Sequence, residues 1–345
     1  MTAPRFLRSR EAFASRGAAL LALPAILAAC SPGSPDAAQV SFTVPNGAPF
    51  GDVVDTLEAH ELVNVPFAFE IVARVRGDDR GVRAGSYEVP ADIGWLPLLD
   101  HLVAGRVVTV PLTIPEGYTL AQIATPIAEF TQAPVEEILA ALEAPNAAND
   151  WRVPGPTLEG YLFPDTYLFA PGVPLDTIVS AMVERHRSFW TDSRRARATE
   201  LGLTEAEVTT LASIVQGEAR VVDEMPVISG VYHNRLEIGY LLQADPTIQY
   251  ALGGRRERLL YADIDSVADH PYNTYTHAGL PPGPIGAPGE AALEAALNPA
   301  DVEFLYFVAR PDGSHIFTRS LQEHNNARIE ARREWDALER SQGGG

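Results

Sequence analysis

Hydrophobic and polar positions along this chain recur in patterns that predict short strands and amphipathic helices. Residues 40–44 (VSFTV) alternate as in a strand, and 303–310 and 314–320, joined by the turn PDG, predict a β-hairpin. Apolar residues at helical spacing predict helices over 49–63, 174–190, 204–222, 225–238 and 322–340. At the start of 204–222, Thr204 and Glu207 have the spacing of a capping box.

One strand–turn–helix pattern occurs more than once. Residues 44–57 (VPNGAPFGDVVDTL) align without gaps on 114–127 (IPEGYTLAQIATPI), and a weaker third copy covers 89–102. The positions expected to face inward are Val53, Leu57, Ile123 and Ile127. Such units resemble small modules of the LysM type, although a strand–turn–helix can also recur by chance.

Residues 241–288 are mostly loop-like, and LPPGPIGAPG at 280–289 cannot hold a regular element. A long irregular stretch inside a compact domain is usually functional. We therefore expect an α+β fold, with small LysM-like strand–helix modules on the N-terminal side. A mixed helical and β domain with long irregular loops should follow.

The N-terminal thirty residues have the features of a secretory signal. Four Arg residues precede a 13-residue apolar run at 17–29, which is shorter than the roughly 20 residues of a membrane-spanning helix. LAAC at 27–30 resembles a bacterial lipobox, in which Cys30 would be lipidated and become the mature N-terminus. The alternative is an ordinary signal peptide with an incidental cysteine.

Composition narrows the chemistry. The formal charge is −19, so nucleic acid is not an expected partner, because phosphate binding requires a basic surface. All 26 basic residues are Arg, which excludes a Schiff-base lysine and the P-loop lysine. The histidines are scattered without ligand spacing, so no metal is expected, and no G-x-S-x-G motif is present.

The segment LASIVQGEAR (211–220) places a carboxylate on the apolar side of a predicted helix. At 100° per residue, one face contains Val208, Leu211, Ala212, Val215, Ala219 and Val222. Glu218 falls beside Leu211 and Ile214, whereas Gln216 and Gly217 point away.

A buried Glu is disfavoured as an anion, so its pKa rises and it can hold a proton near neutral pH. Glycoside-cleaving enzymes need such a general acid to protonate the leaving oxygen. The alternative is a structural ion pair, in which Arg220 or Arg235 neutralises Glu218. The Asn, Gln, Tyr, Thr and Asp residues downstream suit a sugar polymer, or they could simply stabilise turns.

The sequence resembles those of a known family, the MltG/YceG-type endolytic lytic transglycosylases. The motifs occur in the family's order and spacing: AGSY, PEG, EGYLFPDTY, ASIVQGEA, VYHNRL, LQADPTIQY, YNTY, GLPPGPIGAPG, LNPA, YFVA and HIFTRSLQEHN. They extend over about residues 40–335. The resemblance implies an enzyme that cuts nascent peptidoglycan strands, with peptidoglycan synthases as candidate partners.

The family's catalytic glutamate is the second acid of an E-x-E segment and corresponds to Glu218. A lytic transglycosylase can work with one carboxylate, which protonates the glycosidic oxygen and then deprotonates the C6 hydroxyl of MurNAc. Candidates for holding the glycan and orienting Glu218 are Asn234, Gln243, Asp245, Asn273 and Tyr275. No cofactor is needed for this reaction.

Two features depart from the family pattern. The first acid of the E-x-E segment is Gln216 here, and the transmembrane helix with which the family usually begins is replaced by the lipobox-like sequence. The protein is expected in the cell envelope, held to a membrane by its N-terminal lipid and facing the periplasm. The family favours the inner membrane, whereas Ser31 after the cysteine favours the outer membrane.

The expected domains follow from these assignments. They are a lipoprotein signal peptide at 1–29, lipidated Cys30 with a tether at 30–39, LysM-like parts at 40–113 and 114–152, and a catalytic domain at 153–340. The residues alone are compatible with two other functions. One is a hydrolytic muramidase that uses Glu218 with Asp245, and the other is a non-catalytic peptidoglycan-binding lipoprotein.

Overall fold

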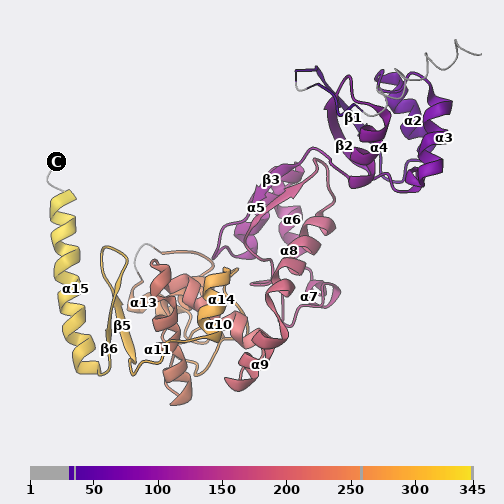
Figure 1. Ribbon diagram of the computed structural model, residues 1–345. Coiled ribbons are helices and arrows are strands. Elements are labelled where there is room, and N and C mark those ends of the chain that lie inside the picture. Colours follow the sequence, from indigo (N-terminus) through magenta and orange to yellow (C-terminus); the bar gives the residue numbers. More distant parts are fainter. Residues whose placement is uncertain (1–30, 35, 257–258, 343–345) are drawn as a thin grey trace, which may run out of the picture. The chain divides into compact units, whose positions relative to one another are not determined.

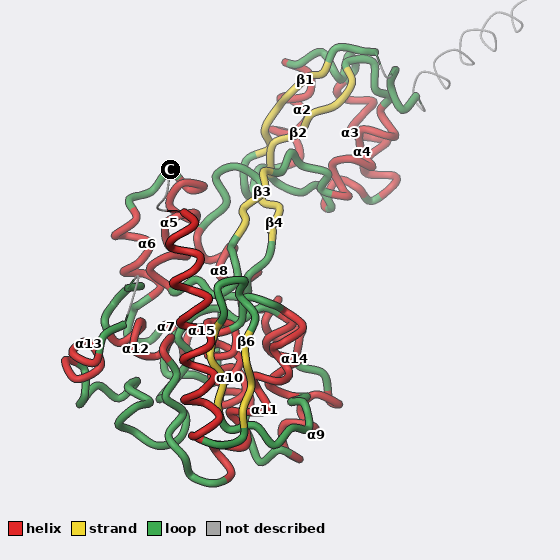
Figure 2. The backbone as a smooth tube through the Cα atoms, turned by 90° about the vertical axis from the view of Figure 1, so that its left-hand side faces the viewer, coloured by secondary structure: helices red, strands yellow, loops and turns green. Residues whose placement is uncertain are grey.

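The computed structural model describes residues 31–34, 36–256 and 259–342, and the chain divides into two compact units between Val110 and Pro111 (Figure 1). Short strands and many helices make up both units (Figure 2), which confirms the expected α+β class. Both the predicted signal sequence at 1–29 and the predicted lipid site at Cys30 lie outside the described residues.

The first unit packs helices on a two-stranded sheet. Its elements are β1 (Gln39–Val44), α2 (Phe50–Ala59), α3 (Pro66–Arg76), the 3-10 helix η1 (Asp78–Arg80), β2 (Gly85–Pro90) and α4 (Trp95–Ala104). The strands are antiparallel, with Phe42 opposite Tyr87. Alternate strand residues point inward, and they form one core with the apolar faces of the helices.

The segment 31–39, expected to be a tether, is bonded to this unit. The Ser31 carbonyl accepts a hydrogen bond from the Gly94 N–H at 2.7 Å, and the Ser34 N–H donates to the Asp92 carboxylate at 2.9 Å. Gln39 already belongs to β1. No helix in the described ranges has both the length and the apolar character needed to cross a bilayer.

The second unit contains two hydrophobic cores. The first core surrounds β3 (Val110–Thr113) and β4 (Thr166–Phe169), which pair with each other. Its helices are α5 (Leu120–Thr131), α6 (Val135–Leu142), α7 (Ala147–Asp150) and α8 (Leu175–Phe189). Residues 114–152 therefore share a core with the segment that follows them.

The second core surrounds α10 (Glu205–Glu218), on which Val208, Leu211, Ile214 and Val215 are fully buried. The other elements of this region are α9 (Asp192–Glu200), η2 (Val222–Glu224), α11 (Met225–Glu237), α12 (Asp245–Ala251), α13 (Tyr261–Ser266) and α14 (Glu290–Leu297). The hairpin β5 (Tyr306–Ala309) and β6 (His315–Thr318) leads into α15 (Leu321–Gln342).

Most predicted elements are confirmed within a few residues, including the hairpin and the helices at 174–190, 225–238 and 322–340. The inward positions of the repeat are also confirmed, since Val53, Leu57, Ile123 and Ile127 are buried. The prediction was wrong at the end of the helix over 204–222. Because α10 stops at Glu218, Val222 is not on its buried face and is 58% exposed.

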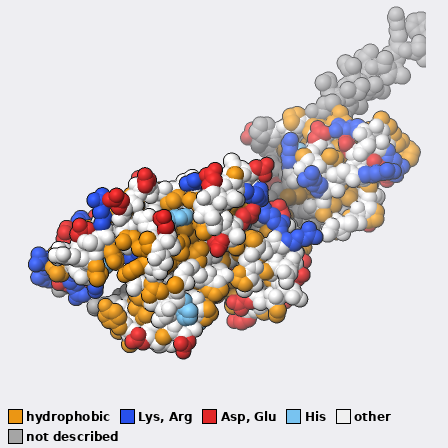
Figure 3. All heavy atoms as spheres, turned by 90° about the horizontal axis from the view of Figure 1, so that it is seen from below, with side chains coloured by type: hydrophobic (Ala, Val, Ile, Leu, Met, Phe, Trp, Pro, Cys, Tyr) orange, Lys and Arg blue, Asp and Glu red, His pale blue; other side chains and the backbone are white. Residues whose placement is uncertain are grey.

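The stretch at 241–288 is mostly irregular, as expected, and it contains the two short helices α12 and α13. Acidic and Arg side chains are interspersed on the face drawn in Figure 3. No continuous basic surface is seen on that face.

Candidate active site

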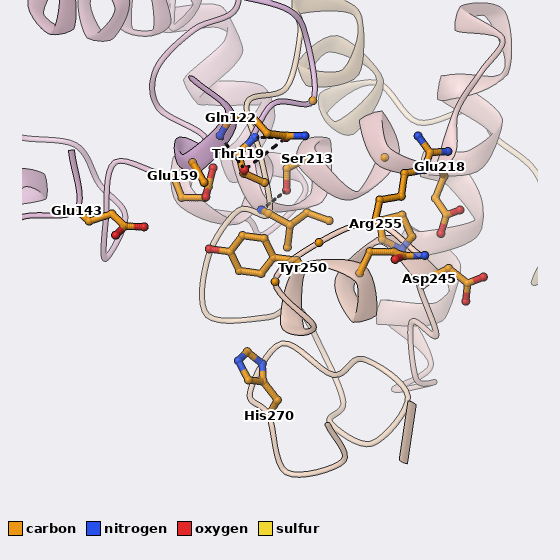
Figure 4. Close-up of a pocket in the computed structure, with 18 residues that line it drawn as sticks. Thr119, Gln122, Glu143, Glu159, Ser213, Glu218, Asp245, Tyr250, Arg255 and His270 are labelled. Carbon is orange, nitrogen blue, oxygen red and sulfur yellow. Dashed lines mark hydrogen bonds between the residues drawn. The ribbon is translucent and has the colours of Figure 1, made fainter. Parts of the chain in front are cut away.

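A pocket of about 680 Å³ opens in the second unit between the two hydrophobic cores. One wall comes from the start of α5 and the end of α6, and the other comes from α10 and α12. Glu218 and Asp245 lie at one end of the pocket, whereas Glu143 and Glu159 lie at the other (Figure 4).

Helix α10 places Glu218 on the pocket wall. The predicted capping box is confirmed at its start, where the Thr204 hydroxyl accepts from the Glu207 N–H and the Glu207 carboxylate accepts from the Thr204 N–H. Farther along, the Ser213 hydroxyl accepts a hydrogen bond from the Ile285 N–H at 3.0 Å. Glu218, the last residue of the helix, is half-buried and lines the pocket.

The surroundings of Glu218 favour its neutral form. Burial is the largest cause, and it raises the pKa of Glu218 to about 8, with repulsion from Asp245 adding to the effect. The Tyr232 hydroxyl donates a hydrogen bond to Glu218 Oε1 at 2.7 Å, which lowers the pKa in part. The carboxyl group is thus poised to hold and release a proton near neutral pH.

The alternative of a structural ion pair is not what the structure shows. No salt bridge to Glu218 forms within the described parts of the chain. Arg235 instead donates through Nε to the Leu305 carbonyl at 2.7 Å and through Nη1 to the Leu242 carbonyl. Arg220 is exposed beside Gly313.

Asp245 is the second carboxylate at this end of the pocket. It begins α12, and its carboxylate accepts a hydrogen bond from the Tyr275 hydroxyl at 2.6 Å. Close packing brings α12 against α10, since a Cβ at Gly217 would lie 2.8 Å from the Cβ of Pro246. A side chain at Gly217 would therefore push Asp245 away from Glu218.

Three other predicted site residues form hydrogen bonds with backbone carbonyls and do not line the pocket. The Asn234 amide donates to the carbonyls of Val302 and Phe304 at 2.7 and 3.0 Å. Asn273 is fully buried, and its amide donates to two carbonyls near α13. Gln243 adopts a left-handed backbone with φ of 48°, and its N–H donates to the Thr274 carbonyl at 3.0 Å.

Gln216, two residues before Glu218 on α10, is half-buried. Its side-chain oxygen accepts a hydrogen bond from the Gly289 N–H at 3.0 Å. Together with the bond from Ile285 to Ser213, this contact fastens the loop at 280–289 along α10. Gln216 therefore has a structural role as a hydrogen-bond acceptor, which an amide oxygen can fill as well as a carboxylate oxygen.

Glu159 and Tyr250, which were not among the residues expected at the site, line the same pocket. Glu159 is 4% exposed, and burial raises its pKa to about 7. It belongs to the motif EGYLFPDTY, which was visible in the sequence. No periodicity marks Glu159 as buried, because it lies on irregular backbone.

Among the described residues, no group of three or more His, Cys, Asp or Glu side chains is arranged to hold a metal ion. Two of the scattered histidines have local partners. His315 contacts the Glu224 carboxylate at 2.7 Å, and His233 bonds to the Ala296 carbonyl at 2.9 Å.

Comparison with known proteins places this arrangement in a family. Residues 42–330 match the YceG-like family, and the chain belongs to that family. This result confirms the resemblance drawn from the sequence motifs.

Three relatives illustrate the similarity. An endolytic murein transglycosylase of Bacillus subtilis (strain 168) is 31% identical over 305 residues, covering 84% of this chain and 84% of that protein. One from Streptococcus pneumoniae (strain R6) is 28% identical over 322 residues, covering 84% of this chain and 58% of that protein. The crystal structure of a yceG-like protein from Listeria monocytogenes has a TM-score of 0.58 and 30% identity, covering 84% of this chain and 99% of that one.

Proposed function

We propose that this chain is an endolytic murein transglycosylase, a lyase that cuts between MurNAc and GlcNAc within peptidoglycan strands. The observation that carries the proposal is the Glu218 carboxyl, whose pKa of about 8 keeps it protonated at neutral pH on the pocket wall. Membership of the YceG-like family, with curated relatives that carry this name, supports the choice of substrate.

In the proposed reaction, Glu218 first acts as a general acid. It gives its proton to the oxygen that links MurNAc C1 to GlcNAc, and the C1–O bond breaks. The resulting carboxylate then takes the proton of the MurNAc C6 hydroxyl, whose oxygen bonds to C1 and closes a 1,6-anhydro ring. No water is consumed, and Glu218 ends the cycle protonated.

One carboxylate is enough for this reaction because the nucleophile belongs to the substrate. A well-positioned intramolecular group can lower the barrier by roughly 7–11 kcal/mol relative to a bimolecular attack. The Tyr232 hydroxyl, bonded to Glu218 Oε1, stabilises the carboxylate that forms after proton donation. The other carboxyl oxygen then carries the proton that is exchanged with substrate.

Asp245 lines the pocket and accepts a hydrogen bond from Tyr275, so this pair is proposed to bind the sugar strand beside Glu218. Asn234, Gln243 and Asn273 are proposed to contribute by fixing the loops that shape the site. A hydrolytic muramidase would instead use Asp245 to activate water.

The remaining parts of the chain are assigned by pattern. The order β1–α2–α3–β2 in the first unit supports a LysM-like fold for 40–113, with a related part at 114–152 and the catalytic domain at 153–340. The sequence at 1–30 supports a signal peptide and a lipid on Cys30, which would hold the enzyme on a membrane facing the periplasm. Nascent strands and peptidoglycan synthases are the proposed substrate form and partners.

Product analysis in water enriched in oxygen-18 tests the proposed function. The protein is incubated with purified murein strands, and the released fragments are analysed by mass spectrometry. We expect anhydro-MurNAc ends without oxygen-18. Reducing MurNAc ends that carry oxygen-18 would establish a muramidase, and uncut strands that remain bound would establish a binding protein.

A further inference from the structure

A guanidinium group lies at the same end of the pocket as the proposed general acid. Arg255 lines the pocket, and Figure 4 shows it at the end that holds Glu218 and Asp245. Its side chain is exposed and forms no ion pair or hydrogen bond with another residue of the described ranges. Since no carboxylate in those ranges neutralises it, its positive charge faces the pocket.

The backbone on both sides of Arg255 is fixed to α12, which forms part of the pocket wall. On the N-terminal side, the Gly254 N–H donates to the Gln249 carbonyl at 3.1 Å, and Gly253 turns the chain with a left-handed φ of 71°. On the C-terminal side, the Gln249 side chain accepts from the Arg256 N–H and donates to the Arg256 carbonyl at 3.2 Å. Arg255 therefore stands on anchored backbone, although it belongs to a loop.

The next residue shows that this placement is particular to Arg255. Arg256 is also exposed, but it does not line the pocket. The same loop thus contributes one guanidinium group to the pocket and keeps the other outside it. The two residues have the same charge and similar exposure, so they form a natural pair of test site and control.

The rest of the pocket is acidic. Besides Arg255, its titratable side chains, tyrosine apart, are those of Glu143, Glu159, Glu218, Asp245 and His270. Among the described residues that line the pocket, Arg255 is the only one with a permanent positive charge. The Asp245 carboxylate already accepts from the Tyr275 hydroxyl. An anionic group of a ligand would therefore be repelled by the acids and attracted to one position, the Arg255 guanidinium.

We propose that Arg255 forms a subsite for a carboxylate on the lactyl branch of MurNAc, and so favours this sugar over GlcNAc beside Glu218. The inference rests on the proposed function. MurNAc differs from GlcNAc by a lactyl ether on O3, whose carboxyl group is either free or joined to the stem peptide. The stem peptide has carboxylates of its own, whereas GlcNAc has none. A guanidinium group binds a carboxylate through two parallel charge-assisted hydrogen bonds.

Three substrates test the subsite and separate the two sources of the carboxylate. Uncrosslinked peptide-bearing murein strands offer only stem-peptide carboxylates. Strands trimmed with an amidase offer only the lactyl carboxylate. Peptide-bearing strands whose carboxyl groups have been converted to amides with carbodiimide and ammonia offer none.

Steady-state kinetics on these substrates give the expected pattern for Arg255→Gln. The change should raise KM about threefold to tenfold on at least one of the two anionic substrates, because an exposed charge-assisted contact is lost. It should change kcat by less than about twofold and leave KM on the neutral strands unchanged. An effect on peptide-bearing strands assigns the subsite to the stem peptide, and an effect on trimmed strands assigns it to the lactyl group.

Arg256→Gln removes the same charge from the same loop outside the pocket, so it should leave KM unchanged on all three substrates. Arg255→Lys keeps the charge and should recover part of the affinity, and the advantage of the wild type should shrink in about 0.5 M salt. The proposal is overturned if Arg255→Gln leaves KM unchanged on both anionic substrates, if it raises KM equally on the neutral strands, or if Arg256→Gln has the same effect.

A binding measurement separates this inference from the proposed function. Affinity for the peptide-bearing and trimmed strands is measured by fluorescence anisotropy in a Glu218→Gln background, with and without Arg255→Gln. Weaker binding with Arg255→Gln supports the subsite even if the wild-type enzyme proves to be a muramidase. Equal affinities for both kinds of strand overturn it even if the wild-type enzyme forms anhydro ends.

Discussion

The Tyr232 hydroxyl donates a hydrogen bond to Oε1 of Glu218 at 2.7 Å, joining α11 to the last residue of α10. This contact lowers the pKa of Glu218, whereas burial and the Asp245 carboxylate raise it. The Tyr232 phenol has a pKa well above its usual value because it is buried, so it remains a donor throughout the useful pH range. The proton affinity of Glu218 is therefore set by opposing neighbours that can be removed one at a time.

Tyr232→Phe should raise the pKa of Glu218, because the removed hydrogen bond favours the ionised form. A general acid is active below its pKa, so the alkaline limb of the kcat profile should move to higher pH. The maximal kcat should fall by about tenfold, since the carboxylate formed after proton donation loses its donor.

Measurement of kcat from about pH 5 to about pH 10 checks this, within the range where Glu218 is expected to titrate. Tyr240→Phe, at a half-buried tyrosine that contacts Tyr306 and Arg235, is the control and should leave the limb in place. An alkaline limb that moves to lower pH in Tyr232→Phe would contradict the assignment.

Asp245→Asn should have the opposite effect on pH dependence. Loss of a nearby negative charge makes ionisation of Glu218 easier, so its pKa falls and the alkaline limb moves to lower pH. The product should still carry anhydro ends, because the proposed reaction uses one carboxylate. Asp269→Asn, at an exposed aspartate outside the pocket, serves as the control.

Gly217→Ala should weaken catalysis through packing. The added methyl group would meet Pro246 at 2.8 Å and force α12 away from α10, which displaces Asp245. We expect a loss of about 1–3 kcal/mol in the free energy of unfolding together with a lower kcat. Gly51→Ala in α2, where a Cβ meets nothing within 4 Å, is the control, and equal effects at both sites would contradict this account.

Glu218→Gln should make the protein more stable at alkaline pH. The folded pKa of about 8 lies above the ordinary value of 4.5, so the folded state binds more protons and wild-type stability falls as pH rises between these values. Gln cannot ionise, so the stability difference should grow by on the order of 1–4 kcal/mol between about pH 5 and about pH 9. Urea unfolding at both pH values measures it, and a difference independent of pH would show that Glu218 titrates normally.

The sequence predicted the apolar placement of Glu218 correctly, because helical periodicity fixes which side chains share a face. Periodicity alone does not predict the residue at which the helix ends. Val222 fits the apolar face, yet the helix stops at Glu218 and the chain turns into η2. At this end the helix packs on a segment distant in sequence, since a Cβ at Gly217 would lie 2.8 Å from Pro246.

The polar residues of the irregular segments show a second limit. Asp245 lines the pocket and Tyr275 bonds to it, whereas Asn234 and Asn273 bond to backbone carbonyls. Residue type cannot separate these roles, because an amide suits a sugar hydroxyl and a carbonyl equally well. Glu159 could not be predicted for a different reason: it lies on irregular backbone, where no periodicity indicates burial.

In the proposed reaction, Glu218 alone supplies both the acid and the base. The most direct measurement is the rate at which anhydro-MurNAc ends form from purified murein strands with wild type, Glu218→Gln and Asp245→Asn. We predict a loss of about 10²–10⁴-fold for Glu218→Gln, with strand binding retained, and continued formation of anhydro ends by Asp245→Asn. A Glu218→Gln variant that forms anhydro ends at the wild-type rate would contradict the account.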